Sequence, residues 1–538
     1  MFDLLIKNAK VIDGSGSPWF KADIAVKDGM IKKVGKLGDI EADNVIDAAG
    51  KVVSPGFIDA HAHTDFVAVA VNNAESKITQ GVTTDVSGMC GLTPAPVNPG
   101  TLNQLKQYLA PFIPKEVEMN WNWRSMGDWM DIIDKQGNST NLAVFVGHGA
   151  IRIAVMGFDN REPRAEEMEE MKKLVAQAME EGALGLSTGL IYPPGCYSKK
   201  DELIELCKVV AKYGGIYITH MRSEGVEVIQ ALEEAIDIGR QSGCPVQISH
   251  HKVAGRENFG LSEKTLGIME KARQEGIDVT CDVYPYTAGS TLISALLPKW
   301  VHDGGVEKML ERINNSNTRK RIAEELKEDI PGWENLAKGA GWNGILICSC
   351  ENDKACEGKT IQEIADERGM NPVDALFDII SKERGKSTMA IFMMDDNDNN
   401  RIVAHRLSMI GSDALACSFS GALGQGKPHP RCFGTFPRVL GKYVREDKVL
   451  SLETAVWKMT GFPATRFGIK NRGFIKEGLI ADMVIFDPET IIDKATYKNP
   501  FQQAEGIDYV IMNGEIVVDH KVYNGKTLGR VIRQSSSI

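Results

Sequence analysis

Apolar and polar residues alternate near both ends of the chain, in the pattern of strands with one buried face. Four segments share this pattern: 3–11, 22–34, 481–486 and 509–518. Asp28-Gly29 lies inside the second segment and Asn513-Gly514 inside the fourth, and both pairs favour tight hairpin turns because they tolerate positive φ angles. We therefore predict that residues 1–53 and 470–538 together form one small β domain.

Between the two ends, short runs of β-branched residues alternate with charged segments that have helical periodicity. The clearest helical segments are 164–181, 201–213 and 227–241. The candidate strands are 52–58, 81–87, 142–147, 183–189, 215–220, 245–250, 277–283 and 408–413. This alternation favours parallel strands and predicts an α/β fold, a (β/α)8 barrel of the TIM type over residues 54–469. A ninth run at 389–394 competes for the seventh strand position.

The stretch that follows the seventh candidate strand is too long for an ordinary loop of such a barrel. It covers residues 291–386 and contains helical patterns of its own, at 318–328 and 360–368. We predict that this stretch forms an inserted, lid-like subdomain.

Composition and charge narrow the classes of partner. With 538 residues, 43% of them hydrophobic and 25% charged, the chain has the composition of a globular protein. The net charge of -10 and the lack of clustered Lys and Arg argue against nucleic acid as a partner. No leader peptide and no apolar run of the roughly 20 residues that a membrane helix needs is visible, so we expect a cytoplasmic protein with reduced cysteines. It is expected to be a monomer or a small homo-oligomer.

The strongest local signal is a strand that runs straight into two histidines. In the run from Pro55 to His63, His61 and His63 are two positions apart, so strand alternation places both imidazoles on one face. At the carboxyl end of a first barrel strand, that face looks into the mouth where barrel enzymes keep their active sites. A chance His-x-His pair is not rare, and the position after a buried strand is what favours a metal site.

Further polar residues follow other candidate strands. His220 and His250 each end an apolar run, and Asp413 closes the eighth one. A single buried histidine is more often a hydrogen-bonded core residue, and an aspartate in this position is as often a helix N-cap. Four histidines at strand ends favour a shared metal site over these separate structural roles, with Asp413 as the carboxylate that faces it.

An anionic metal ligand is missing from the predicted fourth strand, which carries neither Lys nor Glu. Cys90, just beyond the second strand, is the candidate for this role because a thiolate is a good zinc ligand. Cys90, His220 and His250 would then supply three protein ligands and leave a fourth position open, as in a catalytic zinc site. His61 and His63 would hold a weaker second metal or shape the site.

These residues resemble the amidohydrolase superfamily and, within it, the N-acyl-D-amino-acid deacylases, also called D-aminoacylases. Matching stretches run along almost the whole chain: 55–63, 81–90, 189–195, 219–224, 248–252, 282–286, 412–413 and 429–437. The cysteine in place of a strand-four lysine separates this family from dihydropyrimidinases and dihydroorotases. The chain departs from the family pattern at Met89, where Asn is usual, and at Ala414, where Gly is usual.

The resemblance implies a zinc enzyme that hydrolyses N-acyl-D-amino acids to a carboxylate and a free D-amino acid. It also implies a β-sandwich formed by both chain ends and an insertion that covers the site. It favours one tightly bound zinc ion and leaves a second, weaker site open. The preference for D over L substrates is implied by the resemblance alone.

Roles for individual residues follow from the chemistry and the resemblance together. Asp413 is the expected general base, which takes a proton from water and returns it to the leaving amine. Tyr192 stands in a matching family position, where its hydroxyl would support the oxyanion, although a rim aromatic is an equal alternative. The resemblance implies that Lys252, Tyr284 and Ser290 bind the carboxylate of the substrate. Arg222 either reaches an acidic substrate side chain or forms a structural ion pair.

Three alternatives stay open at this stage. A cyclic amidase of the dihydropyrimidinase or hydantoinase type would need a carboxylated lysine, which the fourth strand lacks. A D-dipeptide hydrolase would use the same ligands on a different substrate. A catalytically inactive scaffold would lack metal ligands. The chain has all six candidate residues: His61, His63, Cys90, His220, His250 and Asp413.

Overall fold

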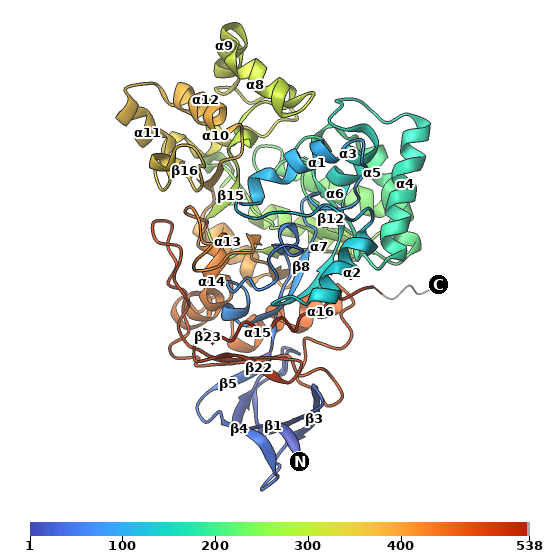
Figure 1. Ribbon diagram of the computed structural model, residues 1–538, viewed down its shortest axis with the longest axis vertical. Helices are drawn as coiled ribbons and strands as arrows, with labels where there is room; N and C mark the ends of the chain where they lie inside the picture. The colour runs from blue at the N-terminus through green and yellow to red at the C-terminus, as the bar shows by residue number, and fades with distance from the viewer. Residues whose placement is uncertain (535–538) are drawn as a thin grey trace.

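The structure, a computed structural model, describes residues 1–534, and its two chain ends share one sheet. The strands are β1 Phe2–Val11, β2 Phe20–Lys27, β3 Met30–Gly35, β4 Ala42–Asp47, β5 Val52–Pro55, β20 Met483–Phe486, β21 Ile507–Met512, β22 Glu515–Asp519 and β23 Val522–Tyr523. Their order is β23-β22-β21-β20-β5-β1-β2-β3, with β4 on β1, and antiparallel pairing of β5 with β20 joins the two ends. This sheet lies at the base of the molecule (Figure 1).

A second group of strands is parallel and fully buried, as expected for strands covered on both faces. They are β6 Phe57–Asp59, β8 Val82–Ser87, β9 Asn141–Val144, β10 Val146–Gly147, β11 Gly185–Gly189, β12 Ile216–His220, β13 Val246–Ile248, β14 Val279–Val283 and β18 Ser408–Ile410. The pairing order is β6-β8-β9 in one sheet and β10-β11-β12-β13-β14-β18 in another, and only Phe145 separates β9 from β10. Eight of these nine strands, from β8 to β18, occupy seven of the predicted ranges, and their ends differ from the predicted ones by at most three residues.

The last of these strands also contacts the first. The Ala60 N–H donates to the Ile410 carbonyl at 3.1 Å. Just beyond, β7 (Ala62–His63) pairs in parallel with β19 (Ala414–Leu415). These contacts bring the residues that follow β6 next to the residues that follow β18.

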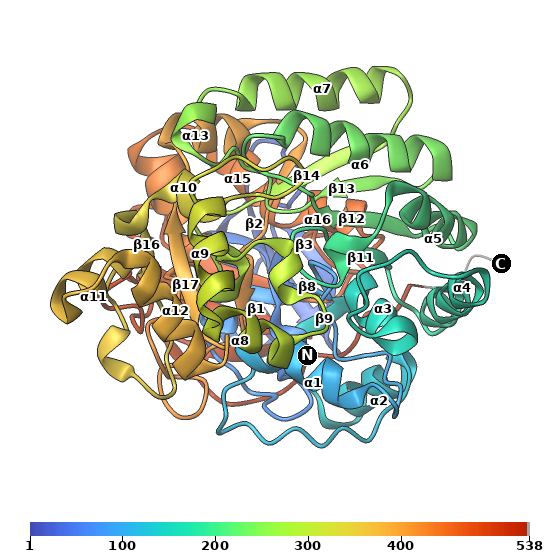
Figure 2. The same cartoon turned by 90° about the horizontal axis from the view of Figure 1, so that it is seen from above.

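Helices cover the outside of the parallel strands (Figure 2). They are α1 Leu102–Leu109, α2 Met126–Gln136, α3 His148–Met156, α4 Ala165–Glu180, α5 Lys200–Lys212, α6 Val228–Ser242, α7 Ser262–Gln274, α13 Asp396–Ala404, α14 Arg431–Arg438, α15 Leu452–Met459 and α16 Gly461–Arg466. Helix α6 shows why these segments are helical, because its buried residues recur at intervals of three and four from Val228 to Gly239. It ends at Gly243, whose φ of 77° suits a residue without a side chain.

The stretch between β14 and α13 has a sheet and a hydrophobic cluster of its own. Its strands are β15 Ala288–Leu292, β16 Ile345–Ile347 and β17 Thr388–Phe392, and its helices are α8 Val306–Asn314, α9 Ser316–Glu325, α10 Leu336–Ala340, α11 Ile361–Arg368 and α12 Pro372–Glu383. The antiparallel order is β15-β17-β16, and residues from Ile293 to Met393 pack together beside it. This part lies at the opposite end of the molecule from the terminal sheet (Figure 1).

Two sequence predictions are corrected here. The run 389–394 does not take the seventh parallel position, because most of it lies in β17, between two antiparallel partners; β14 pairs with β18 instead. The run 52–58 is not one strand: β5 belongs to the terminal sheet, and the parallel strand begins at Phe57. Pro55-Gly56 separates the two, and the Gly56 N–H donates to the Asp482 carbonyl at 2.9 Å.

Within residues 1–534, no helix is long and apolar enough to cross a lipid bilayer.

Candidate metal centre and active site

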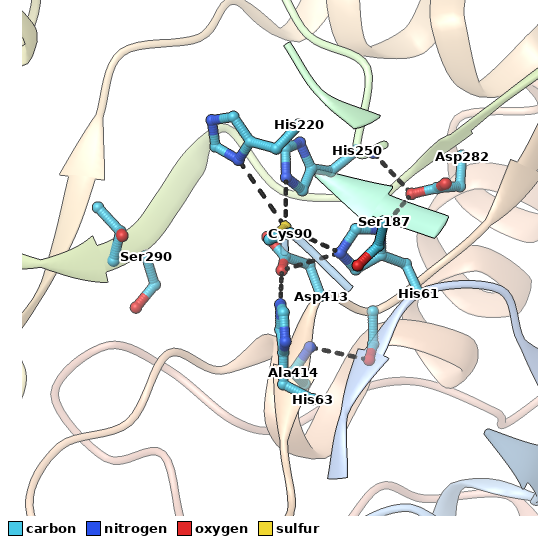
Figure 3. A network of polar contacts seen from close by, with 12 residues as sticks. His61, His63, Cys90, Ser187, His220, His250, Asp282, Ser290, Asp413 and Ala414 are labelled. Carbon is cyan, nitrogen blue, oxygen red and sulfur yellow. Dashed lines mark hydrogen bonds and ion pairs between the residues drawn. The ribbon is translucent and has the colours of Figure 1, made fainter. Parts of the chain in front are cut away.

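Side chains from the carboxyl ends of several parallel strands meet in one buried cluster. The ligand atoms of His61, Cys90, His250 and Asp413 all lie within 4.8 Å of one another. The Cys90 thiol is central: its Sγ is 3.5 Å from His61 Nε2, 3.5 Å from His250 Nε2 and 3.9 Å from His220 Nδ1 (Figure 3). Residues far apart in the sequence are therefore brought together by the strands that they follow.

His63 approaches the cluster from the other side of Asp413. Its Nε2 is 3.2 Å from Asp413 Oδ1, and His61 Nε2 is 3.6 Å from the same oxygen (Figure 3). Burial lowers the pKa of His63 to about 4, so its ring is neutral at physiological pH. A neutral imidazole is the form that binds a metal ion.

Three residues of the cluster have an unusual backbone. Cys90, His250 and Asp413 have φ angles of 55°, 34° and 53°, in the left-handed region. Each such conformation costs a residue with a side chain on the order of 1 to 3 kcal/mol and persists only where the surroundings hold it. Its occurrence at three neighbouring polar residues is typical of a functional site.

Glycines on either side of Cys90 allow this turn to pack closely. Gly88 has a φ of 76°, and a Cβ atom there would lie 2.2 Å from the Phe145 carbonyl oxygen. Gly91 has a φ of 73°, and a Cβ atom would lie 3.0 Å from the backbone nitrogen of Gly189. Only glycine fits at Gly88, so this short segment determines where the thiol points.

Asp282, in β14, orients two of the histidines from behind. Its Oδ1 lies 3.0 Å from His61 Nδ1 and accepts a hydrogen bond of 2.6 Å from the backbone N–H of His250. Burial alone would lower the pKa of His61, but the carboxylates of Asp282 and Asp413 raise it above its ordinary value. Outer carboxylates of this kind fix the tautomer of a metal-binding histidine.

Glu224 and Lys252 form a buried ion pair beside the cluster. Glu224 Oε1 is 2.6 Å from Lys252 Nζ and 2.9 Å from His250 Nδ1, and Oε2 is 3.7 Å from His220 Nε2. Burial by itself would raise the pKa of Glu224. Lys252 and the two histidines have a larger effect in the opposite direction, so the pKa lies below its ordinary value and the carboxylate stays ionised. Sequence reasoning did not identify Glu224 as a site residue, although its position four residues after His220 was a signal.

Arg431 is a second residue that sequence reasoning missed. Its Nη1 donates to Asp413 Oδ2 at 2.7 Å, its Nη2 donates to the Ser290 carbonyl at 3.2 Å, and its guanidinium lies 4.9 Å from the centre of the Tyr284 ring. Burial raises the pKa of Asp413, but Arg431 and neighbouring histidines hold it well below its usual range. Arg431 lies in the matching stretch 429–437, and its positive charge could have indicated a residue that pairs with the carboxylate of Asp413.

The cluster opens into a cavity that is lined both by residues at the strand ends and by residues between β14 and α13. Lys252, Tyr284, Ser290 and Tyr192, for which we expect contact with substrate, all line it. The Tyr192 hydroxyl is 2.8 Å from Thr291 Oγ1, and its ring centre is 5.1 Å from that of His220. Burial holds the pKa of Tyr192 well above its ordinary value, so the hydroxyl stays a proton donor.

Arg222 is the one candidate that lies neither in the ligand cluster nor among the residues that line the cavity. Its Nε is 2.9 Å from Glu234 Oε2, and its Nη2 donates to the Ser198 carbonyl at 3.1 Å. It is not among the residues that line the cavity. The geometry therefore favours the structural ion pair over a contact with substrate.

The residues fit a bound metal ion. One thiol, imidazole nitrogens and a carboxylate converge, which is a ligand set that suits zinc. The Nε2 atom of His220 is buried without a hydrogen bond. Burial and nearby carboxylates hold the pKa of Cys90 well above its ordinary value, so only a cation beside the sulfur would stabilise the thiolate.

The chain is similar to known proteins along its whole length. A sequence profile described as the amidohydrolase family matches residues 44–518. The D-aminoacylase of Alcaligenes xylosoxydans xylosoxydans is 38% identical over 100% of this chain and 98% of its own. The N-acyl-D-glutamate deacylase of the same organism is 34% identical over 100% of this chain and 97% of its own.

Solved structures give the same picture. A D-aminoacylase structure concerned with a binuclear metal centre has a TM-score of 0.82 at 37% identity, over 99% of this chain and 100% of its own. The N-acyl-D-glutamate deacylase of Bordetella bronchiseptica, with zinc and a phosphonate that mimics the tetrahedral intermediate, has a TM-score of 0.82 at 33% identity, over 99% of each chain. A D-hydantoinase has a TM-score of 0.56 at 16% identity, over 99% of each chain, which indicates a shared fold only.

Proposed function

The chain belongs to the amidohydrolase family, and on that premise we propose that it is a zinc-dependent deacylase that converts N-acyl-D-amino acids to a carboxylate and a free D-amino acid. The observation that carries this proposal is the position of the Cys90 sulfur, 3.5 Å from both His61 Nε2 and His250 Nε2. The parallel strand β11 reads Gly-Leu-Ser-Thr-Gly and has no lysine that could be carboxylated. This supports a linear-amide deacylase over a cyclic amidase.

We also propose the fold that places this site. The contact of β18 with the residues after β6 supports a closed (β/α)8 barrel within 54–469, with the candidate ligands at its mouth. The common sheet supports a terminal β-sandwich domain of 1–53 and 470–538. The insertion predicted at 291–386 would act as a lid, since several of its residues line the cavity.

Cys90, His220 and His250 would hold one zinc ion tightly, and His61 and His63 would contribute to a second, weaker site. The Cys90 Sγ lies 3.5 Å from His250 Nε2 and 3.9 Å from His220 Nδ1, which supports the first site. His61 Nε2 and His63 Nε2 both lie beside Asp413 Oδ1, which supports the second. When bound, such a metal polarises a carbonyl group and makes water a better nucleophile at neutral pH.

The chain's own residues supply the proton transfers. Asp413, kept ionised by Arg431, accepts the proton of the attacking water and delivers it to the amine nitrogen, which leaves only when protonated. Tyr192 stays protonated and donates a hydrogen bond to the developing oxyanion. The insertion excludes bulk water, which strengthens both interactions.

Recognition of the substrate carboxylate falls to the cationic side of the cavity. Lys252 Nζ lies 5.4 Å from the centre of the Tyr284 ring, and Arg431 lies on the same ring. Ser290 adds a hydroxyl group at this end of the cavity. A carboxylate placed here would meet fixed donors and positive charge, which is the usual arrangement for carboxylate recognition.

An apolar substrate side chain fits the remaining walls better than an acidic one. Among residues 1–534, Lys252 and Arg431 are the only Lys or Arg residues that line the cavity, and each is already paired with a carboxylate. The stretch between β14 and α13 contributes Leu336, Ile391 and Met393 to the walls. A second carboxylate on the substrate would be buried without a free cation, which is unfavourable.

Free-amine release by zinc-loaded protein tests this proposal, with N-acetyl-D-leucine, N-acetyl-L-leucine, N-acetyl-D-glutamate and dihydrouracil as substrates. We expect D-leucine release to be fastest, and to fall at least about 100-fold in Cys90→Ala, because a ligand of the metal is lost. Cys207→Ala, which removes a buried thiol in α5 outside the cavity, is the matched control and should keep its activity. Faster turnover of dihydrouracil than of any acyl amino acid would overturn the proposal.

A further inference from the structure

The geometry points to a separate groove that binds the alkyl part of a long substrate acyl group, so that the preferred substrates carry medium-length or long acyl chains rather than acetyl. This inference rests on the proposed deacylase function and adds a binding site to it. The groove is a second cavity next to the metal centre, between α1 and the insertion.

The walls of this groove come from two parts of the chain. Tyr108 and Phe112 lie at the end of α1 and just after it, and Val306 and Met309 lie in the first turn of α8. Phe112 and Val306 are only partly buried, although both are apolar. Partly exposed apolar side chains that line the same groove favour an apolar occupant.

The groove adjoins the catalytic cavity. Leu92, Phe112 and Tyr192 line both of them. Tyr192 is the proposed oxyanion donor, so the reacting carbonyl lies beside a residue that the two cavities share. Whatever is attached to that carbonyl therefore lies next to the groove.

The other half of the substrate points elsewhere. The cations Lys252 and Arg431 both lie against Tyr284, which places the α-carboxylate there. Met393 lies on the same side, because a Cβ atom at Gly289 would be 3.2 Å from the Met393 methyl and 3.4 Å from the Tyr284 hydroxyl. The amino-acid part thus occupies the Tyr284 side, and the acyl part is left to face Tyr192 and the groove.

Charge decides the chemistry of the occupant. The charged side chains that line the groove, Glu307, Arg384 and Lys386, are exposed to solvent: Arg384 pairs with Glu307, and Lys386 Nζ lies 3.9 Å from Glu351 Oε2. An alkyl chain would replace water along apolar walls, whereas a charged occupant would find no unpaired partner among those side chains. A hydrocarbon chain is therefore the class of ligand that this groove suits.

The test compares N-acetyl-D-leucine with N-octanoyl-D-leucine as substrates of the zinc-loaded protein. Each buried methylene strengthens binding by about fourfold, so two well-buried methylenes suffice for a tenfold difference. We expect kcat/KM for the octanoyl substrate to exceed that for the acetyl substrate at least tenfold. A ratio below two, with the acetyl substrate hydrolysed, would overturn the groove and leave the proposed function intact.

A pair of matched variants locates the effect. Val306→Phe fills the groove at the start of α8, and Val373→Phe makes the same change near the start of α12, at a residue that lines neither cavity. We expect Val306→Phe to lower the ratio of octanoyl to acetyl turnover at least fivefold and Val373→Phe to leave it unchanged. An equal change in the two variants would contradict the proposal.

Binding of the products gives a readout that does not depend on catalysis. Calorimetry should show one octanoate bound per chain, with affinity at least tenfold above that of acetate and reduced by Val306→Phe but not by Val373→Phe. Absence of octanoate binding would overturn the groove. Octanoate binding that depends on Val306, in a protein that hydrolyses no N-acyl-D-amino acid, would overturn the proposed function and with it the assignment of the groove to a substrate.

Discussion

Among single residues, Glu224 contacts both the candidate substrate-binding residues and the candidate metal ligands. Its one carboxylate reaches Lys252, His250 and His220, so it holds a candidate substrate-binding cation and two candidate metal ligands at once. Its removal would leave Lys252 buried without its anionic partner, which is costly in a site shielded from water. This residue therefore links the proposed carboxylate site to the proposed metal site.

The corresponding variant is Glu224→Gln, which keeps the shape of the side chain and removes its charge. We expect zinc affinity to fall by about 10- to 100-fold, as for other residues that orient metal ligands from behind. Zinc content after dialysis against a buffered metal series measures this. Glu234→Gln is the control, since its partner Arg222 lies outside the cavity, and an equal loss of zinc there would argue against a local effect.

Arg431 determines the charge state of Asp413. Burial alone would raise the pKa of this carboxylate, and the guanidinium 2.7 Å away holds it low. A general base must be ionised, so activity is lost as pH falls through the pKa of Asp413. In Arg431→Met that pKa rises, and the acid limb of the kcat/KM profile should move to higher pH.

Arg431→Lys keeps a positive charge and should show a smaller shift of the acid limb. The pH profile separates this effect from a simple loss of structure, because a misfolded fraction lowers activity equally at every pH. An unchanged acid limb in Arg431→Met would contradict the role given to Asp413.

At the scale of elements, the strand ends and the turns after them build the site. His220 is the last residue of β12, whereas Cys90, His250 and Asp413 follow their strands in left-handed turns. These turns redirect the backbone within one or two residues, which a regular strand cannot do. The turn after β8 depends on Gly88, whose Cβ position is filled by the Phe145 carbonyl.

Gly88→Ala should therefore displace Cys90 as well as strain the backbone. We expect a loss of roughly 2 to 4 kcal/mol in the free energy of unfolding, together with reduced zinc content. The cost of the strained backbone and the cost of the clash between the new Cβ atom and the Phe145 carbonyl add together. Gly243→Ala is a matched control, because Gly243 has a φ of 77° but open space at its Cβ position. It should lose about 1 kcal/mol and keep its zinc.

At the scale of the whole molecule, the site joins elements that are distant in sequence. Its candidate ligands follow β6, β8, β12, β13 and β18, and the insertion lies over the cavity that they border. A cation bound by these residues would tie the strands together and offset the buried carboxylates. Bound metal stabilises the native state by about 4 kcal/mol when it is present at a thousandfold excess over its dissociation constant.

Removal of the metal by a chelator should lower the midpoint of thermal unfolding by several degrees, and added zinc should restore it. Scanning calorimetry with and without chelator measures the difference. Cys90→Ala should show a smaller shift, because it binds the metal less tightly in the first place. An identical shift in both proteins would show that the stabilising metal lies elsewhere.

The sequence determined much of this protein by itself, because strand and helix patterns and turn residues are local properties. The sequence indicated the positions of the parallel strands, their alternation with helices, the long insertion and the resemblance to the amidohydrolases. The comparisons confirm the family. Histidines at strand ends were legible for the same reason: parallel strands meet at their carboxyl ends, so their position along the chain predicts their neighbourhood.

Only the tertiary structure decided which side chains meet across long separations. Residues 389–394 have a strand pattern, but most of them lie in β17, which pairs with β15 and β16. No local signal in the sequence distinguishes this pairing from a position beside β18. Arg222 and Arg431 both lie in matching stretches, yet one turns toward Glu234 and the other toward Asp413. The path of the chain around them decides this, since the charge partner of a long side chain depends on contacts that the one-dimensional pattern does not contain.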